Sequence, residues 1–292
     1  MIKDKKSTRK PDSSAEAEQG ERLQKVLARL GLASRREVEE WIRNGRVTIN
    51  GQYAKLGDRC RPGDRITANG RPLNLEAGLN EPTRVLIYHK PTGEVVTRRD
   101  PEGRPVIFSQ LPKPTRGRWI SIGRLDINTQ GLLLVTNNGE LANRLMHPSH
   151  EIEREYAVRV LGRIDEATLN RLTTGVELED GEAHFERIAV AGGEGANQWF
   201  HVTLKEGRNR IVRRLWESQG IQVSRLIRIR FAHIHLPPRL RAKTSMELPA
   251  EETNKLLEYV GLPTETLTPT TPVKERPQRR GNAPQGRPPR RG

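Results

Sequence analysis

The order of strand and helix patterns between residues 84 and 260 constrains the fold more than any other feature of the chain. Strand-like stretches outnumber helix-like ones, and the two kinds do not alternate steadily. A steady alternation would predict a parallel sheet, because parallel strands need crossover connections. The irregular order instead predicts an α+β domain with a mixed, largely antiparallel sheet and flanking helices. The expected strands are 84–91, 119–123, 131–136, 153–162, 183–192, 198–207 and 223–236, and the expected helices are 140–146, 165–175 and 208–220.

A smaller unit, residues 21–69, precedes this domain. In ERLQKVLARL (21–30) the apolar residues recur at the spacing of one helix face. Ser34 and Glu37 have the spacing of a capping box, which predicts the start of a second helix. The alternating stretch RVTI and the Asn50-Gly51 pair then predict a strand and a tight turn. We therefore expect a compact unit of two helices and a hairpin.

Composition sets the limits of the remaining segments. Residues 1–20 are polar and charged without apolar periodicity, and residues 261–292 are rich in polar residues, Pro and Arg, so we expect a disordered arm and a disordered basic tail. Residues 70–83 contain several turn formers and indicate a linker.

Other classes of protein are disfavoured by what the chain lacks. No apolar stretch approaches the roughly 20 residues of a membrane helix, and the charged N-terminus has no apolar core of a secretory signal behind it. Cys60 is the only cysteine, so no disulfide within the chain and no thiolate metal cluster are expected. We expect a soluble, cytoplasmic protein with no membrane partner.

The excess of basic residues indicates a polyanionic partner. The chain has 51 Lys and Arg against 36 Asp and Glu, which gives a formal net charge of +15. Because each neutralised phosphate releases counterions, such an excess favours nucleic acid as the partner. The arginines cluster beside helix and strand patterns, which favours RNA over a role in solubility alone. For the basic tail, contact with an RNA backbone and a purely solubilising role both stay open.

Common catalytic motifs are missing from the sequence. It contains no Walker-type phosphate loop, no GxGxxG after a strand, no HExxH and no GxSxG. His147 and His150 are not joined by an acid or cysteine that completes a set of metal ligands. His233 and His235 lie on the same side of an expected strand, and we expect them to be structural or to face RNA. We therefore expect neither a metal nor a cofactor.

Three features carry candidate chemistry. Gly123 ends a strand and places Asp126 on a loop, the common position for catalytic groups. Tyr156 offers a stacking face and a hydroxyl. An arginine near the helix pattern 208–220 can pair with a buried carboxylate and keep it ionised; the candidates are Arg208, Arg210, Arg213 and Arg214. Taken singly, each feature also has a simpler interpretation. Asp126 can cap a turn, Tyr156 can lie at the edge of the core, and the arginines can form a row of phosphate contacts.

These features lie in segments that resemble a known family. GRLDINTQGLLLVTNNGELANRLMHP (123–148) closely resembles the signature of the pseudouridine synthases that act on small- and large-subunit rRNA. EREYAV (153–158) and GRNRIVRRLWESQGIQVSRLIRIR (207–230) resemble that family's second and third motifs, and HKPTGEVVTRRDPEGRPVIFSQLP (89–112) is similar to its opening segment. LASRREVEEWIRNGRVTINGQ (32–52) resembles the alpha-L RNA-binding domain. The resemblance implies an alpha-L domain at 21–69 followed by a pseudouridine synthase domain at 84–260.

The resemblance also implies a role for each residue that matches a motif. Asp126 is implied to be the catalytic carboxylate and the nucleophile. Arg124 is implied to help extrude the target uridine by entering the vacated stack, and Tyr156 to stack on the uracil and help remove its C5 proton. Arg213 is implied to pair with Asp126, and Val212 to pack near the base.

Further contacts to RNA are expected from four arginines. Arg35 and Arg36 lie in the first turn of the second helix of the small unit, where free amides also suit phosphate. Arg208 and Arg210 lie at the start of the third motif. That motif has Asn209-Arg210-Ile211 where many relatives have His-Gln, which favours a large-subunit substrate and a binding role for Arg210. EGRNRIVRRLWE and GGEGANQWF likewise resemble the large-subunit members of the family.

Three functions stay open at this level. The first is isomerisation of uridine to pseudouridine in large-subunit rRNA, or in a ribosomal assembly intermediate, by a monomer. The second is a non-catalytic rRNA-binding or ribosome-assembly factor, which would not need Asp126, Tyr156 and Arg213 together. The third is a hydrolase with two carboxylates, for which Glu140 is the nearest second acid.

Overall fold

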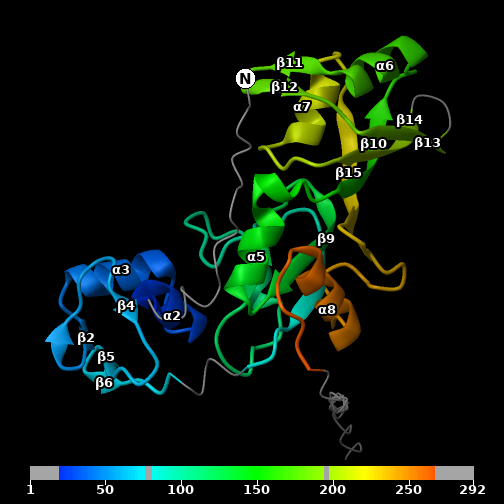
Figure 1. Cartoon of the computed structure of the whole chain (residues 1–292). Coiled ribbons are helices and arrows are strands. Elements are labelled where there is room, and N and C mark those ends of the chain that lie inside the picture. Colours follow the sequence, from blue (N-terminus) through cyan, green and yellow to red (C-terminus); the bar gives the residue numbers. More distant parts are fainter. Residues whose placement is uncertain (1–19, 76–80, 194–196, 267–292) are drawn as a thin grey trace, which may run out of the picture.

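The computed structural model describes residues 20–75, 81–193 and 197–266. The expected arm up to residue 19, the middle of the expected linker and the tail from residue 267 onward lie outside the described residues. The described chain forms a small N-terminal domain and a larger domain that contains the main sheet (Figure 1).

The small domain consists of two helices packed on short strands. The predicted capping box is confirmed, because the Glu37 amide donates to Ser34 Oγ at 3.1 Å and the Ser34 amide donates to the Glu37 carboxylate at 3.3 Å. The apolar sides of both helices meet the strands in a buried cluster that includes Leu23, Leu27 and Val38. The elements are β1 (Glu21–Arg22), α2 (Leu23–Arg29), α3 (Arg35–Arg43), β2 (Val47–Ile49), β3 (Gln52–Tyr53), β4 (Arg59–Cys60), β5 (Ile66–Ala68) and β6 (Arg71–Pro72).

The larger domain is built on a nine-stranded sheet. Its main strand order is β13-β14-β10-β15-β9-β7-β17, with β8 paired to β9 and β16 paired to β15. Only the β9–β15 pair is parallel among the described strands of this sheet, so the expected mixed, largely antiparallel sheet is confirmed. The strands are β7 (Val85–Lys90), β8 (Ile120–Ile122), β9 (Gln130–Thr136), β10 (Arg154–Leu161), β13 (Arg187–Gly192), β14 (Asn197–Leu204), β15 (Val223–Phe231), β16 (Ile234–His235) and β17 (Ser245–Glu247).

The parallel pair joins the two halves of the sheet at a very close approach. Gly131 of β9 lies opposite Arg228 of β15. Gly131 has a φ of +107°, and a Cβ at this position would lie 2.7 Å from the Arg228 backbone nitrogen and closer still to its carbonyl oxygen. Glycine permits both the conformation and the approach. The loop before β9 is thereby brought beside β15, and through β15 beside β10.

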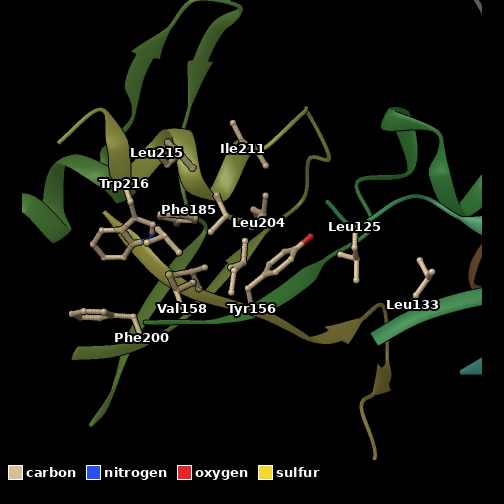
Figure 2. Packing of buried hydrophobic residues seen from close by; sticks show 14 of the residues in the cluster. Leu125, Leu133, Tyr156, Val158, Phe185, Phe200, Leu204, Ile211, Leu215 and Trp216 are labelled. Atoms are coloured by element: carbon tan, nitrogen blue, oxygen red, sulfur yellow. The ribbon is translucent and has the colours of Figure 1, made fainter. Parts of the chain in front are cut away.

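Helices cover both faces of this sheet. On one face, Trp216 of α7 is fully buried, and its ring lies 5.3 Å from that of Phe200 and 6.0 Å from that of Phe185 (Figure 2). On the other face, α5 and α8 contribute leucines to a second buried cluster. The helices and the extra hairpin are η1 (Ile107–Ser109), α5 (Gly139–Met146), η2 (Pro148–His150), α6 (Glu166–Thr174), β11 (Val176–Leu178), β12 (Gly181–Ala183), α7 (Ile211–Glu217) and α8 (Ala250–Tyr259).

Several expected elements were wrong in extent. The stretch 223–236 is not one strand, because the chain turns at Ala232, whose φ is +52°, and β16 pairs back onto β15. The stretch 183–192 is likewise divided between the end of β12 and β13, and α8 was not predicted.

Folded residues also extend into the expected linker (70–83) and into the expected basic tail (261–292). β6 pairs with β5, so the small domain continues past residue 69. Beyond residue 260, Leu262 packs on the second cluster, and the Thr83 amide donates to the Glu265 carboxylate at 2.6 Å. Neither segment has the apolar periodicity by which its neighbours were recognised.

The two domains meet through charged side chains. Lys25 of α2 places Nζ 3.0 Å from Glu140 Oε2 at the first turn of α5. Arg144 Nε lies 3.2 Å from the other oxygen of the same carboxylate. Figure 1 shows α2 and α3 on the side of the larger domain that carries α5. Glu140, the second acid that a hydrolase would need, is therefore held by two cations.

None of the described helices combines the length and apolar content that a membrane crossing needs.

Candidate active site

A short loop between β8 and β9 presents Asp126. Gly123 has a φ of +77° and turns the chain out of β8. Arg124 is exposed, Leu125 is buried in the core and Asp126 is half-buried. The loop closes with a hydrogen bond of 3.0 Å from the Thr129 amide to the Asp126 carbonyl oxygen. Leu125 thus anchors the loop in the core, whereas Arg124 is exposed and Asp126 is partly accessible.

The backbone of this loop is held by a fully buried lysine that was not singled out in the sequence. Lys90 Nζ donates to the carbonyl oxygens of Pro91 at 2.9 Å, Asp126 at 3.0 Å and Thr129 at 3.0 Å. These bonds use the three N–H groups of an ammonium. Alternation along β7 places Lys90 on the same face as Leu86 and Tyr88. A lysine on the apolar face of a strand was the available signal.

The Asp126 carboxylate itself is uncommitted. It has no hydrogen bond and no ion pair with any described residue. The expected pairing of Arg213 with Asp126 is wrong as a direct contact, because the guanidinium donates to the carbonyl oxygens of Val223 at 2.9 Å and Asn128 at 3.0 Å. Burial lowers the pKa of Arg213, whereas the charge of Asp126 acts in the opposite direction. Arg213 therefore acts on Asp126 through space and through the backbone of its loop.

Tyr156 lies beside this loop on β10. Its ring is buried, and Figure 2 shows its hydroxyl directed toward Leu125. The pairing of β10 with β15 shifts register between Glu155 and Tyr156, so that Tyr156 lies opposite Arg228. Such an irregularity re-aims a side chain at a site.

Asp126 and Tyr156 line the same cavity, which has a volume of about 1030 Å³. Arg124, Arg210 and Val212 also line it, so residues from three distant parts of the sequence meet there. Val212 is buried on α7, and Arg210 precedes that helix with a left-handed φ of +49°. The structure thus brings together the candidate residues of all three motifs, with Arg213 placed behind the loop.

Two further arginines of this cavity were missed. Arg154 and Arg228 are buried, and each guanidinium lies 5.2 Å from the centre of the Phe231 ring. Burial lowers the pKa of Arg154. Arg228 Nε donates to the Leu132 carbonyl oxygen at 2.7 Å, while one of its terminal nitrogens is buried without a partner among the described residues. Their buried charges add to the positive field of the site.

The other candidate arginines differ in availability. Arg208 is committed to the β11–β12 hairpin, because it bonds to the carbonyl oxygens of Asp180, Gly181 and Glu182 at 3.0, 3.0 and 2.7 Å and to the Glu206 carboxylate. It therefore anchors this hairpin, and its donors are not free for phosphate.

Arg35 and Arg36, in contrast, are exposed in the first turn of α3. The Ser34–Glu37 capping box orders this turn, so both side chains leave a fixed backbone.

The arrangement favours nucleophilic catalysis by a carboxylate on an anionic substrate. A free carboxylate, a buried tyrosine and several cations share one cavity, whereas no three His, Cys, Asp or Glu side chains in the described part of the chain are grouped as a metal site requires. A carboxylate of this kind can act as a nucleophile, and the surrounding cations can hold phosphates.

Comparisons with known proteins agree with this chemistry. Residues 84–218 match the family model described as RNA pseudouridylate synthase, and residues 21–66 match that of the S4 domain. The chain is 57% identical over 260 residues to a ribosomal large subunit pseudouridine synthase B of Pasteurella multocida, which covers 88% of this chain and 75% of the relative. It is 55% identical over 264 residues to the protein of that name from Escherichia coli K12, which covers 90% of this chain and 91% of the relative.

A solved structure gives the same result for the fold. A crystal structure of pseudouridylate synthase superposes with a TM-score of 0.57 at 26% identity, over 81% of this chain and 100% of that one. The resemblance to large-subunit members, expected from EGRNRIVRRLWE and GGEGANQWF, is confirmed by the identities to the two named relatives. With an S4 domain before its catalytic fold, the chain belongs to the RNA pseudouridylate synthase family.

Proposed function

We propose that this chain converts uridine to pseudouridine at a specific position of large-subunit rRNA, either free or in an assembling particle, and that it acts as a monomer. The observation that carries the proposal is the Asp126 carboxylate, which faces a cationic cavity without any partner among the described residues. The relatives at 55% and 57% identity are named as ribosomal large subunit pseudouridine synthases, which supports the substrate class.

The first step is extrusion of the target base. A stacked uridine cannot reach a carboxylate that lines a cavity, so it must leave its stack at a cost of a few kcal/mol. Arg124 is exposed in the β8–β9 loop that carries Asp126 (residues 123–129, the catalytic loop), and its guanidinium can occupy the vacated place and stack on the neighbouring bases. The flipped base then enters the cavity between Tyr156 and Val212.

The second step is rearrangement of the glycosidic bond. The bond between C1′ and N1 breaks, a bond between C1′ and C5 forms, C5 loses its proton and N1 gains one. Asp126 acts as the nucleophile that supports the detached state, and the cavity keeps the free base close. Tyr156 stacks on the ring and offers its hydroxyl for the C5 proton. Reactant and product contain the same atoms, so the reaction consumes no oxidant or reductant.

Contacts away from the base hold the RNA. Arg35 and Arg36 are exposed on α3 of the S4 domain. Arg210 lines the cavity and forms an ion pair with Glu217, in which a terminal guanidinium nitrogen lies 3.2 Å from Oε1. Phosphate contacts of this kind position the substrate without reading its sequence. We assign Arg35, Arg36 and Arg210 to this role and place Arg208 outside it.

Asp126→Asn tests the proposal. The change is nearly isosteric and removes the nucleophilic charge, so release of tritium from rRNA labelled at uridine C5 is expected to disappear while RNA binding persists. In cells, a carbodiimide and reverse-transcription map of large-subunit rRNA is expected to lose one stop, which names the nucleotide.

Asp165→Asn is the matched control. Asp165 caps α6 through a hydrogen bond of 2.8 Å to the Thr168 amide, and asparagine caps a helix equally well. This variant is expected to keep full activity. Tritium release by Asp126→Asn at the wild-type rate would remove Asp126 from the reaction. Absence of tritium release from the wild-type chain would instead make a non-catalytic RNA-binding protein the better assignment.

A further inference from the structure

A buried pair of side chains behind the catalytic loop has no part in the reaction described above. Tyr88 of β7 donates its hydroxyl to Glu94 Oε2 at 2.5 Å. The two residues are 0% and 2% exposed, and Glu94 Oε1 has no hydrogen-bond partner among the described residues. An incompletely satisfied buried carboxylate is costly. A nearby positive charge would offset that cost.

The nearby positive charge is Lys90. It follows Tyr88 by two residues, so both side chains leave the same face of β7. The carboxylates that act on the ammonium are Glu94, from the loop after β7, and Asp126, from the loop before β9. Burial lowers the pKa of Lys90 to about 8, and Glu94 and then Asp126 oppose this decrease. Since no carboxylate forms an ion pair with Lys90 in the described chain, the compensation acts through space.

The loop that carries Glu94 is also joined to the catalytic loop. The Gly93 amide donates to the Ile127 carbonyl oxygen at 2.8 Å. Lys90 Nζ bonds to the carbonyl oxygens on either side, at Asp126 and Thr129. A change at Glu94 can therefore affect the backbone that presents Asp126 in two ways, through the Gly93–Ile127 hydrogen bond and through Lys90.

We propose that Glu94, held by Tyr88, is a positioning residue whose carboxylate keeps Lys90 protonated, so that Lys90 fixes the backbone of residues 126–129 and presents Asp126 to the substrate. A neutral amine has two N–H groups and cannot serve three carbonyl oxygens, so the loop loosens when Lys90 loses its proton. The inference rests on the proposed function, because it assigns Glu94 a role in the same reaction.

The pH dependence of turnover tests this role. Glu94→Gln keeps the shape and an acceptor for Tyr88 but removes the charge. Loss of a negative charge lowers the pKa of Lys90, so the ammonium is lost at lower pH than in the wild type. We expect the alkaline decline of kcat to move down by about one pH unit, measured by tritium release from about pH 6.5 to about 9. At the acidic end kcat is expected to be near that of the wild type, and KM to stay within about twofold throughout.

Tyr88→Phe is the comparison variant, because it removes the hydroxyl and keeps the charge of Glu94. It is expected to move the alkaline decline less than Glu94→Gln does. Lys90→Met allows a second measurement, the thermal stability of this variant with and without Glu94→Gln. If the Tyr88–Glu94 contact were purely structural, removal of Lys90 would not change the effect of Glu94→Gln on stability. Lys90→Met leaves the Glu94 carboxylate buried without its cation, so adding Glu94→Gln is expected to restore part of the thermal stability lost in Lys90→Met.

The outcomes separate this inference from the proposed function. A Glu94→Gln profile that overlays the wild type, or a loss of kcat that is equal at every pH, would overturn the positioning role. A double variant that is less stable than Lys90→Met would also overturn it. If Asp126→Asn is inactive in the same assay, the proposed function stands in either case. If Asp126→Asn is active, the role assigned to Asp126 fails independently of Glu94, whereas the proposed function fails only if the wild-type chain releases no tritium.

Discussion

Substituting Gly131 by alanine perturbs the parallel seam between β9 and β15 that holds the site together. The added Cβ would lie 2.7 Å from the Arg228 backbone nitrogen and closer still to its carbonyl oxygen. Backbone atoms of a central strand cannot rotate away as a flexible side chain can, so the two strands must separate. That separation moves the Asp126 loop away from Tyr156.

The expected loss of stability has two parts. A non-glycine residue at a φ of +107° is strained, at a cost of about 1–3 kcal/mol. Forcing extra volume into a packed position costs about 1–3 kcal/mol more. The sum of about 2–6 kcal/mol is a large share of the ~5–15 kcal/mol by which a typical domain is stable.

Gly162→Ala separates these two parts. Gly162 follows β10 with a φ of +103°, but a Cβ there meets no atom within 4 Å. It therefore reports the conformational strain alone, about 1–3 kcal/mol. Free energies of unfolding from urea titrations compare the variants, and tritium release gives kcat. Since a displacement of about 1 Å at a reacting group costs roughly 100-fold in rate, Gly131→Ala is expected to lose activity as well as stability, whereas Gly162→Ala keeps its activity. Equal losses of stability in both variants, with kcat retained in Gly131→Ala, would refute the close approach of the two strands.

Three further outcomes are expected. Replacing Arg35 and Arg36 by alanine should weaken RNA binding and reduce the slope of log affinity against log salt by about 0.7–0.9 for each phosphate that is no longer neutralised. An unchanged slope in filter binding would exclude binding of phosphate by these arginines. Arg213→Lys keeps a charge but loses the planar guanidinium that donates to two carbonyl oxygens. The kcat for tritium release should therefore fall with little change in KM. A comparable rise in KM would assign Arg213 to substrate binding. Trp216→Ala should cost about 3–5 kcal/mol of unfolding free energy in urea, because the indole is fully buried against Phe200; a loss below about 1 kcal/mol would show that α7 repacks.

Local interactions made much of the fold predictable. The capping box at Ser34 and Glu37 involves residues three positions apart, so its sequence spacing already contains its geometry. The exposed position of Arg35 follows from the same turn. The β8–β9 loop was also recognisable, because Gly123 and a continuous apolar strand enclose Asp126.

Contacts between distant residues were not predictable in this way. The turn at Ala232 carries no glycine or proline signal, and its left-handed φ is imposed where β16 pairs back onto β15. Arg208 and Arg213 both stand in one arginine-rich motif, yet one binds the carbonyl oxygens of the β11–β12 hairpin and the other those of the catalytic loop and β15. Side-chain type alone does not distinguish a phosphate ligand from a backbone anchor.

The sequence by itself determined the types and order of most elements, the exposed loop that carries Asp126 and the motifs that identify the family. The tertiary structure decided which residues surround the carboxylate. Lys90 and Glu94 reach the loop only because β7 pairs with β9, and Tyr156 reaches the cavity because β10 and β9 both pair with β15. Helix caps and turns depend on neighbours in sequence, whereas buried charges find their partners through strand pairing across the sheet.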